Sequence, residues 1–382
     1  MLHTHLKMQK IVTKWRRLER SVMAFSEVAK ALKAILVVAL VVVVLFLVSS
    51  YVFAMFLGPT LFFFTPEGSA ISRLQIQYPL YVQLFILLIF ILPITPTYGT
   101  VFLFLCCVFV LCFVAGYKFR ESLSGVIRKC PLRSIGSLFN NWLFAMPVVT
   151  SMLLIAVITI QAFQEAHGLP TGEPTLPPNH FEAFFLISYA PLFEEIGFRV
   201  SPIGAFLIVY LFWVRRNSAS MWSWGQRLKL FFLSLIYPDG AKKMVGAKTV
   251  SDFGVIGGIS LGEWGMVIFT SVAFGLAHYL FGGGWEVGKI ATASMVGFAM
   301  GLVYLLYGVQ APILIHWFFN YYGSVIELAS DFYPIVDPFF STTLGITTIL
   351  GVFGWLIVTI FGLYKLFRAI VKRIRPSEPL AI

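Results

Sequence analysis

The stretch AILVVALVVVVLFLVSSYVFAMFL, from Ala34 to Leu57, decides the class of this protein. It contains no charged residue, and roughly 20 apolar residues suffice to cross about 30 Å of hydrocarbon as a helix. It starts too late and runs too long for the apolar part of a cleaved signal peptide, and no small-residue cleavage site follows it. We therefore expect a transmembrane helix here.

The composition of the whole protein agrees with this. Hydrophobic residues make up 59% of the 382 residues and charged residues only 12%, whereas soluble domains carry about 25% charged residues. The formal net charge is +11, but lysine and arginine cluster at the ends of apolar segments, where they orient helices and meet anionic lipid. The partner predicted for this charge is the lipid bilayer and not nucleic acid.

Seven further apolar segments follow the first. They cover residues 80–117, 142–163, 181–214, 255–281, 287–309, 311–329 and 343–367. Prolines interrupt two of them, Pro93 and Pro96 in the first and Pro202 in the third, so each of these two is either a single crossing or a hairpin. Counting each as one crossing predicts an all-α polytopic membrane helix bundle with about eight crossings.

The distribution of basic residues predicts the orientation of this bundle. Cytoplasmic loops carry an excess of lysine and arginine. Placing the N-terminus inside puts the basic segments in the cytoplasm and the loops 58–72 and 164–180 outside. The basic segments are 1–33, 118–133, 215–248 and the tail after 367. We therefore expect a multi-pass cell-membrane protein with both termini cytoplasmic.

Four regions follow from this layout. They are a basic cytoplasmic N-terminal arm at 1–33, N-terminal transmembrane helices at 34–163, a motif-bearing transmembrane core at 181–329 that includes the basic cytoplasmic loop 215–248, and a last transmembrane helix with a basic tail at 343–382. The portion KLFFLSLIY of that loop is expected on the membrane surface.

The four cysteines show no disulfide or zinc pattern. Cys106, Cys107 and Cys112 lie in one apolar segment, Cys130 lies in a basic loop, and no CxxC pair occurs. The pattern predicts buried thiols.

Three apolar segments carry polar groups at the depth of the membrane. They contain PLFEEIGFRV (Pro191–Val200), FGLAH (Phe274–His278) and HWFFN (His316–Asn320). A charged group at bilayer depth is costly and is a functional-site hypothesis by default. Each feature also has a structural reading, because histidine and asparagine can simply tie helices together.

Helical spacing predicts how these groups face one another. Glu195 and Arg199 are four residues apart, so they can form an ion pair within one helix. Glu194 is turned by about 100° from Glu195, so one carboxylate can be structural while the other faces a cavity. His316 and Asn320 share a helix face and offer an imidazole and an amide as donors.

Two neighbouring features complete this set. His278 lies beside Gly275 and Ala277, which let a second helix approach closely. Glu263 is the main rival acid, but it occurs in GGISLGEWG at the start of its apolar segment and is expected near the membrane interface.

These groups suit the hydrolysis of a peptide bond without a covalent intermediate. A carboxylate and a histidine beside one water molecule can deprotonate it, and general-base catalysis typically contributes about 10²–10⁴-fold. An imidazole and an amide can donate to a tetrahedral oxyanion, where loss of one donor costs roughly 10²–10³ in rate.

Two other chemistries stay open. Two glutamates and two histidines could bind zinc and generate hydroxide, although no HExxH motif is present. Carboxylates and histidines also form proton relays in carriers, although the two halves of the sequence show no repeat of the kind that many transporters have.

The three motifs together resemble a known family. EEIGFR matches EExxxR, FGLAH matches FxxxH and HWFFN matches HxxxN, in that order along the sequence. This resembles the CPBP family of intramembrane glutamate endopeptidases, which includes type II CAAX prenyl endopeptidases and bacteriocin-processing or immunity proteins. The resemblance covers about Phe181 to Asn320. The basic loop 215–248 does not fit a pattern of the family.

The resemblance implies a role for each motif residue. Glu194 would be the general base on the attacking water, assisted by His278. His316 and Asn320 would form the oxyanion site. The residues that would shape and orient the site are Glu195, Arg199 and Phe274.

The resemblance also implies a fold and a substrate. The fold is an all-helical bundle around a cavity that opens to the cytosol and laterally to lipid, with no cofactor and no metal ion. The substrate class is a membrane-associated or lipidated peptide or protein, which in eukaryotic members is a prenylated CaaX tail. A zinc-dependent membrane metalloprotease and a non-enzymatic immunity or transport protein are the alternatives.

Overall fold

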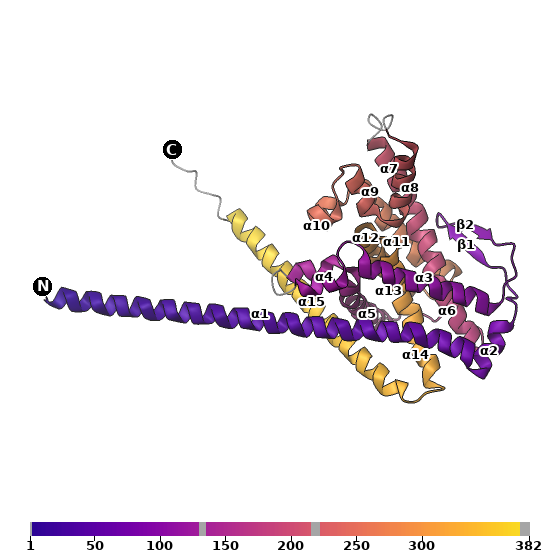
Figure 1. Cartoon of the computed structure of the whole chain (residues 1–382), viewed down its shortest axis with the longest axis horizontal. Helices are drawn as coiled ribbons and strands as arrows, with labels where there is room; N and C mark the ends of the chain where they lie inside the picture. The colour runs from indigo at the N-terminus through magenta and orange to yellow at the C-terminus, as the bar shows by residue number, and fades with distance from the viewer. Residues whose placement is uncertain (1, 130–134, 215–221, 375–382) are drawn as a thin grey trace.

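The computed structural model describes residues 2–129, 135–214 and 222–374, and these residues form a bundle of helices (Figure 1). Cys130, the start of the basic loop at 215–221 and the tail beyond 374 lie outside the described residues, as do most side chains of the arm at 1–33. Seven of the described helices are long and apolar enough to cross a membrane. They are Lys30–Phe64, Tyr98–Arg128, Trp142–Ala166, His180–Val214, Leu261–Phe281, Gly288–Tyr307 and Val336–Val371.

The first span is part of a much longer helix. Helix α1 runs from Leu2 to Phe64, so the expected arm and the first crossing are one element. In Figure 1 its N-terminal end extends far from the bundle. Thr65 then begins α2 (Pro66–Arg73), because its hydroxyl accepts a hydrogen bond from Gly68 N at 3.1 Å and proline fits the first helical position.

The proline-broken segment 80–117 is neither a single broken helix nor a helical hairpin. It contains a β-hairpin of β1 (Tyr81–Leu84) and β2 (Leu88–Ile91), and only then α3 (Tyr98–Lys118). Pro93 and Pro96 lie between β2 and α3, where they disfavour a helix because proline cannot donate within a helix and restricts the residue before it. The tip of the hairpin is anchored by Ile86 N, which donates to Gly197 O at 3.1 Å.

A single asparagine joins α3 to the next span. After the short α4 (Leu123–Arg128) and the 3-10 turn η2 (Ile135–Asn140), α5 runs from Trp142 to Ala166. Asn141 Oδ1 accepts from Phe144 N at 3.2 Å, while its amide donates to Gly116 O and Tyr117 O in the last turn of α3, both at 3.0 Å, and to Glu121 O just after α3. The start of α5 is therefore fixed against the end of α3.

The second proline-broken segment is one continuous helical element and not a hairpin. Helix α6 (His180–Glu195) continues through a π turn, η3 (Ile196–Val200), into α7 (Ser201–Val214). Pro202 provides no backbone donor. The Ser201 hydroxyl instead donates to Ile196 O at 2.7 Å and to Gly197 O at 3.2 Å.

The described part of the basic loop 215–248 is helical. It forms α8 (Trp224–Ile236), which packs against α7, and α9 (Pro238–Met244), and α10 (Val250–Gly258) follows. The KLFFLSLIY portion is therefore mostly a helix against the bundle, with Leu230 buried and Phe232 exposed.

Helices α11 (Leu261–Phe281) and α12 (Gly288–Tyr307) form the closest pair of the bundle. A Cβ atom at Gly275 would lie 2.4 Å from Ile290 O, so only glycine permits this approach. The expected start at 255 is too early, because Ser260 and Glu263 form a capping box that begins α11 at Leu261.

The expected eighth crossing at 311–329 is also helical. It consists of α13 (Gln310–Trp317), the π turn η5 (Phe318–Tyr322) and α14 (Gly323–Ser330). It is absent from the seven apolar spans, and it includes the polar residues His316 and Asn320. π turns frequently mark functional sites, and here η3 and η5 both adjoin the motif residues.

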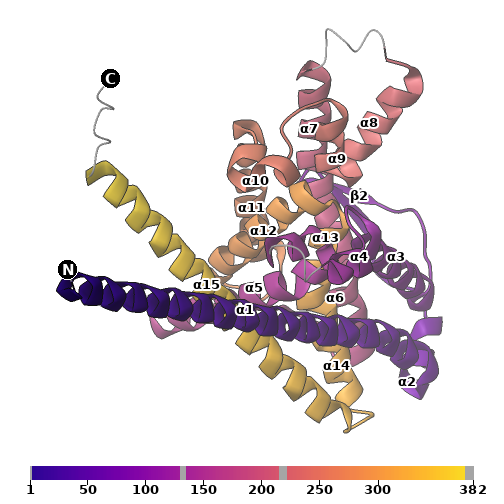
Figure 2. The same ribbon diagram turned by 60° about the vertical axis from the view of Figure 1, so that its left-hand side comes forward.

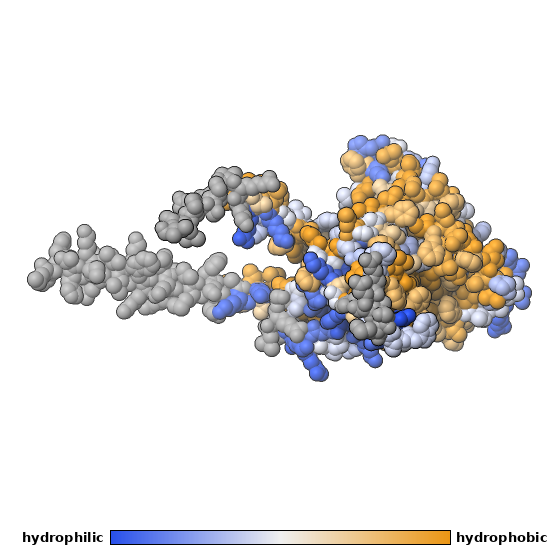
Figure 3. All heavy atoms as spheres, turned by 90° about the horizontal axis from the view of Figure 1, so that it is seen from above, coloured by the Kyte–Doolittle hydropathy of each residue, from blue (hydrophilic) through white to orange (hydrophobic). Residues whose placement is uncertain are grey.

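Helix α15 (Val336–Ile374) completes the bundle and crosses α1 (Figures 1 and 2). It packs on α5, where Trp355 Nε1 donates to Met152 O at 2.8 Å. The space-filling view in Figure 3 shows extensive hydrophobic surface over the body of the molecule, as expected for a protein in lipid. The all-α bundle is thus confirmed, apart from one short hairpin.

The thiols differ from the expectation in one respect. Cys106 and Cys112 are buried, but Cys107 is exposed on another side of α3, because neighbouring residues on a helix point about 100° apart. These three cysteines are free thiols.

Candidate active site

The motif residues meet where η3, α11 and the α13–η5 junction approach one another. Glu195 and Arg199 are both fully buried, and Glu195 Oε1 accepts from Arg199 Nη1 at 2.9 Å. The same oxygen lies 2.9 Å from His316 Nδ1. One carboxylate oxygen therefore joins the first motif to the third.

Glu194 faces away from this buried pair, as the helical period predicts. Its side chain is 31% exposed, compared with 0% for Glu195. Its Oε2 atom lies 3.8 Å from His316 Nε2, which is too far for a hydrogen bond. Oε2 of Glu194 therefore lies near the imidazole of His316 without a hydrogen bond to it.

Both histidines hold a proton on Nδ1, but they bond different acceptors through it. The carboxylate of Glu195 accepts, so His316 Nδ1 carries a proton, and Nε2 can also donate only if the ring is cationic. His278 Nδ1 lies 2.9 Å from Phe274 O, which can only accept. A neutral His278 ring therefore has its lone pair on Nε2, which is the form that accepts a proton.

Phe274 forms the wall between these groups. The Arg199 guanidinium lies 4.2 Å from the centre of its ring, a cation–π contact. The ring centres of His278 and His316 lie 4.5 Å and 5.8 Å from that of Phe274. Gly297 in α12 provides the room for Arg199, because a Cβ atom there would lie 2.9 Å from Arg199 Nη2.

Asn320 lies in η5, four residues after His316. Its Nδ2 atom is 3.5 Å from Ile187 O, the limit of a hydrogen bond. Asn320 is therefore only weakly held by the described residues and can donate to another acceptor.

A cavity of about 90 Å³ collects most of these side chains. Its lining includes Phe274, His278, His316 and Asn320 from two of the motifs. Glu194 is not part of this lining, but its Oε2 atom lies 3.8 Å from Nε2 of His316, which is. Phe319 of the third motif also lines the cavity, and the residues from outside the motifs are Val157, Lys289, Thr292, Ala293, Val296 and Met300.

Sequence reasoning missed Lys289 and the hairpin. Lys289 is the one charged residue of the apolar segment 287–309 and is its third residue. A lysine at such a position ordinarily marks the end of a transmembrane helix. The ring of Tyr81 in β1 contacts that of Tyr189, with centres 6.2 Å apart, so β1 lies beside the helix that carries Glu194. A hairpin has no motif that relates it to a site so distant in sequence.

The end of the cavity near Lys289 bears on the predicted orientation. Glu286 N donates to Thr171 O and Gly288 N to Pro170 O, both at 2.9 Å. This end therefore lies beside the loop 164–180, which the positive-inside rule assigns to the outside. That assignment places this end of the cavity outside, whereas the resemblance implies an opening to the cytosol. Labelling cysteines introduced at Gly168 and at Lys243 from each side of the membrane would distinguish these two orientations.

Glu263 does not join the site. Its two carboxylate oxygens lie 2.8 and 3.0 Å from Lys242 Nζ, and Oε2 also accepts from Ser260 N at 2.7 Å. It lies at the first turn of α11, as expected, but is fully buried. Its role is to cap α11 and hold α9.

The described residues contain no group of three or more His, Cys, Asp or Glu side chains arranged to hold a metal ion. Glu195 is already engaged by Arg199 and His316.

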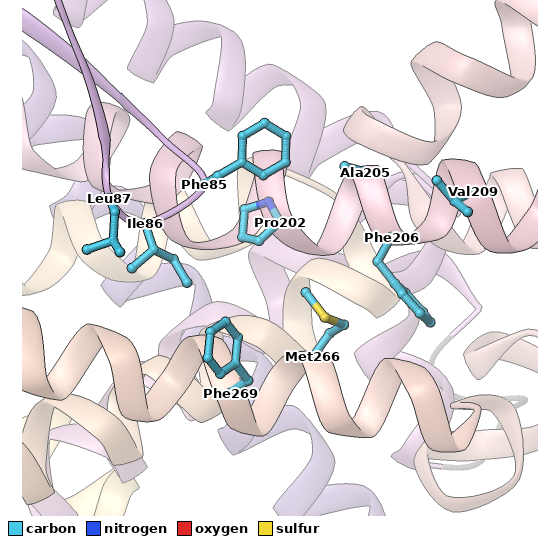
Figure 4. Close-up of a pocket in the computed structure, with 9 residues that line it drawn as sticks. All are labelled: Phe85, Ile86, Leu87, Pro202, Ala205, Phe206, Val209, Met266 and Phe269. Atoms are coloured by element: carbon cyan, nitrogen blue, oxygen red, sulfur yellow. The ribbon is translucent and has the colours of Figure 1, made fainter.

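A larger cavity of about 480 Å³ is separate from these residues. It lies between the hairpin tip, α7 and α11, as Figure 4 shows. Its lining is Phe85, Ile86, Leu87, Pro202, Ala205, Phe206, Val209, Met266 and Phe269. None of these side chains is polar, so the cavity offers apolar contacts and no acid–base chemistry.

Comparison with known families agrees with the resemblance in the motifs. Residues 177–322 match the family model described as type II CAAX prenyl endopeptidase Rce1-like, and this range contains all three motifs. No curated protein and no solved structure matches the sequence. The match indicates a protease of the CAAX type, and with the seven apolar helices it indicates an integral membrane protein.

Proposed function

We propose that this protein is an intramembrane endopeptidase that hydrolyses a peptide bond in a membrane-associated or lipidated substrate by activating water. The observation that carries the proposal is the junction at Glu195. One oxygen of this carboxylate lies 2.9 Å from both Arg199 Nη1 and His316 Nδ1. This contact joins the first motif to the third, whose His316 lines the small cavity.

In the proposed mechanism Glu194 removes a proton from a water molecule, and the oxygen of that water attacks the substrate carbonyl. His278 Nε2 assists as a second acceptor, because its Nδ1 proton is held by Phe274 O. The proton taken from water then passes to the nitrogen of the leaving amine as the C–N bond breaks. Such acid–base steps typically contribute about 10²–10⁴-fold.

The negative charge that develops on the carbonyl oxygen is assigned to His316 and Asn320. Donors act best when they are already in place before charge develops. Glu195 fixes the His316 ring through Nδ1, and donation from Nε2 then requires the cationic ring. Arg199 holds Glu195, and Gly297 leaves the space that Arg199 occupies.

The substrate within this class is proposed from the family match. A prenylated CaaX-type tail is the first candidate, since the matching family is described as prenyl endopeptidases. A zinc-dependent metalloprotease and a non-enzymatic immunity or transport protein are the alternatives that the experiment must separate.

The test is a cleavage assay in liposomes with two quenched fluorogenic peptides, one farnesylated CaaX peptide and one unmodified apolar peptide. Wild type and Glu194→Ala are compared, each with and without a chelator. Cleavage that depends on Glu194 and resists the chelator is expected. Cleavage by Glu194→Ala at the wild-type rate contradicts the role of Glu194, and inhibition that added zinc reverses supports the metal alternative.

A further inference from the structure

One charged side chain in the cavity has no role in the proposed mechanism. Lys289 lines the same cavity of about 90 Å³ as His278, His316 and Asn320. It is half-buried in the first turn of α12. A cation at such a position is costly unless it is paired, and no acid lies within ion-pair distance of it among the described residues.

The structure holds this lysine in place. Its ammonium lies 3.6 Å from the centre of the Trp285 ring, a cation–π contact that fixes position while leaving donors available. The ring of Trp285 also contacts that of His278, with centres 6.5 Å apart. Lys289, Trp285 and His278 therefore form one wall beside the site.

The loop before Lys289 is equally constrained. Its hydrogen bonds to Thr171 and Pro170 hold both sides of the turn, and a Cβ atom at Gly288 would lie 2.7 Å from Pro170 O. A lysine that served only to anchor the helix end in lipid headgroups would face outward. Lys289 instead faces a cavity lined by a histidine and an amide.

We propose that Lys289 binds a carboxylate of the substrate and thereby selects peptides that carry a negative charge close to the scissile bond. This inference rests on the proposed function and names its substrate class. The carboxylate can come from the free C-terminus of the substrate or from an acidic side chain. The small cavity keeps Lys289 and the oxyanion donors around one space, so the charge lies within a few residues of the bond that is cut.

The test uses matched peptides in the free-acid form, in the C-terminal carboxamide form, and in the carboxamide form with glutamate as the last residue. Cleavage by wild type, Lys289→Met and Lys289→Arg is compared. The control is Lys229→Met, which changes an exposed lysine of α8 and is expected to behave as wild type.

Wild type is expected to prefer the free acid over the carboxamide by about ten- to hundredfold in kcat/KM, as for a hydrogen bond to a charged group. In Lys289→Met this ratio should fall to about one, mainly through KM, and Lys289→Arg should retain most of it. If the C-terminal glutamate restores cleavage of the carboxamide peptide, Lys289 accepts any nearby carboxylate. If it does not, Lys289 binds the C-terminal carboxylate. A preference that persists in Lys289→Met overturns the proposal.

Binding separates this inference from the proposed hydrolysis. Anisotropy of the same labelled peptides is measured with wild type and Lys289→Met in detergent. Acid-selective binding that requires Lys289, without any cleavage, overturns the hydrolysis alone. Cleavage without acid preference overturns the role of Lys289 alone, and the absence of both cleavage and selective binding overturns both.

Discussion

Among the described residues, two pairs of opposite charge are buried. Glu195 at the end of α6 pairs with Arg199 in η3, and Glu263 in α11 pairs with Lys242 in α9. All four side chains are nearly inaccessible. In the second pair both carboxylate oxygens are bonded, and Lys242 also donates to Gly258 O. In the first pair Glu195 Oε2 and Arg199 Nη2 have no hydrogen-bond partner among the described residues.

The difference shows why burial of charge alone does not identify an active site. A saturated pair has no capacity left for a ligand, so Lys242 and Glu263 can only hold helices together. The pair at Glu195 retains unused polar atoms and touches His316, which lines a cavity. Buried polar atoms without partners are rare in proteins and call for an explanation. A role in a reaction site would explain them here.

The largest effect is expected from Glu194→Ala. Removing the general base should lower cleavage by at least about 10²–10⁴-fold, while the partly exposed position should leave thermal stability almost unchanged. Cleavage rate and melting temperature are measured on the same preparation. A large fall in melting temperature would show instead that Glu194 is structural, like Glu263.

The next effect is expected from His316→Ala and Asn320→Ala. Each removes one proposed oxyanion donor and should lower kcat by roughly 10²–10³ with little change in KM, because such contacts strengthen in the transition state. Steady-state kinetics on one peptide measure both constants. A change confined to KM would contradict the oxyanion assignment.

Lys242→Met tests the other pair and should act on stability. It leaves the buried carboxylate of Glu263 without its cation, which typically costs about 3–5 kcal/mol. Thermal unfolding in detergent should show a marked decrease in melting temperature, and the double variant Lys242→Met/Glu263→Gln should recover most of it. The kcat of the folded fraction should not change. The exposed Lys229→Met serves as control. A loss of kcat at full stability would place Lys242 in the reaction instead.

Gly297→Ala should produce a smaller loss. The added Cβ atom would lie 2.9 Å from Arg199 Nη2, so Arg199 and Glu195 must shift, at a cost of about 1–3 kcal/mol for overpacking. Reduced kcat with modest destabilisation is the expected result. Gly362→Ala in α15, where no atom lies within 4 Å, is the matched control, and equal behaviour of the two variants would contradict the positioning role.

The smallest effect is expected from metal removal. Dialysis against a chelator should leave kcat unchanged, since the proposed mechanism uses only Glu194 and His278 as proton acceptors. Activity is measured before and after dialysis, with zinc added back. Zinc-dependent recovery would replace the proposed mechanism by the metal alternative.

The sequence predicted much of the fold because its signals are local. Helices such as α12 follow from continuous apolar runs, and Glu195 meets Arg199 because they are four residues apart. The hairpin at 81–91 was not predicted, because local signals do not distinguish it from a transmembrane helix. Its residues are as apolar as those of a span, and the prolines that disfavour a helix there do not specify what replaces it.

What the sequence alone determined is the membrane-helix class and the motif residues, since both depend on composition and on spacing within one segment. The tertiary structure decided which polar groups meet. It brought Glu195 to His316, paired Glu263 with Lys242 and turned Lys289 into the cavity. Helical periodicity relates only residues within one helix. Contacts between helices depend on how the helices pack, which the sequence of a single segment does not fix.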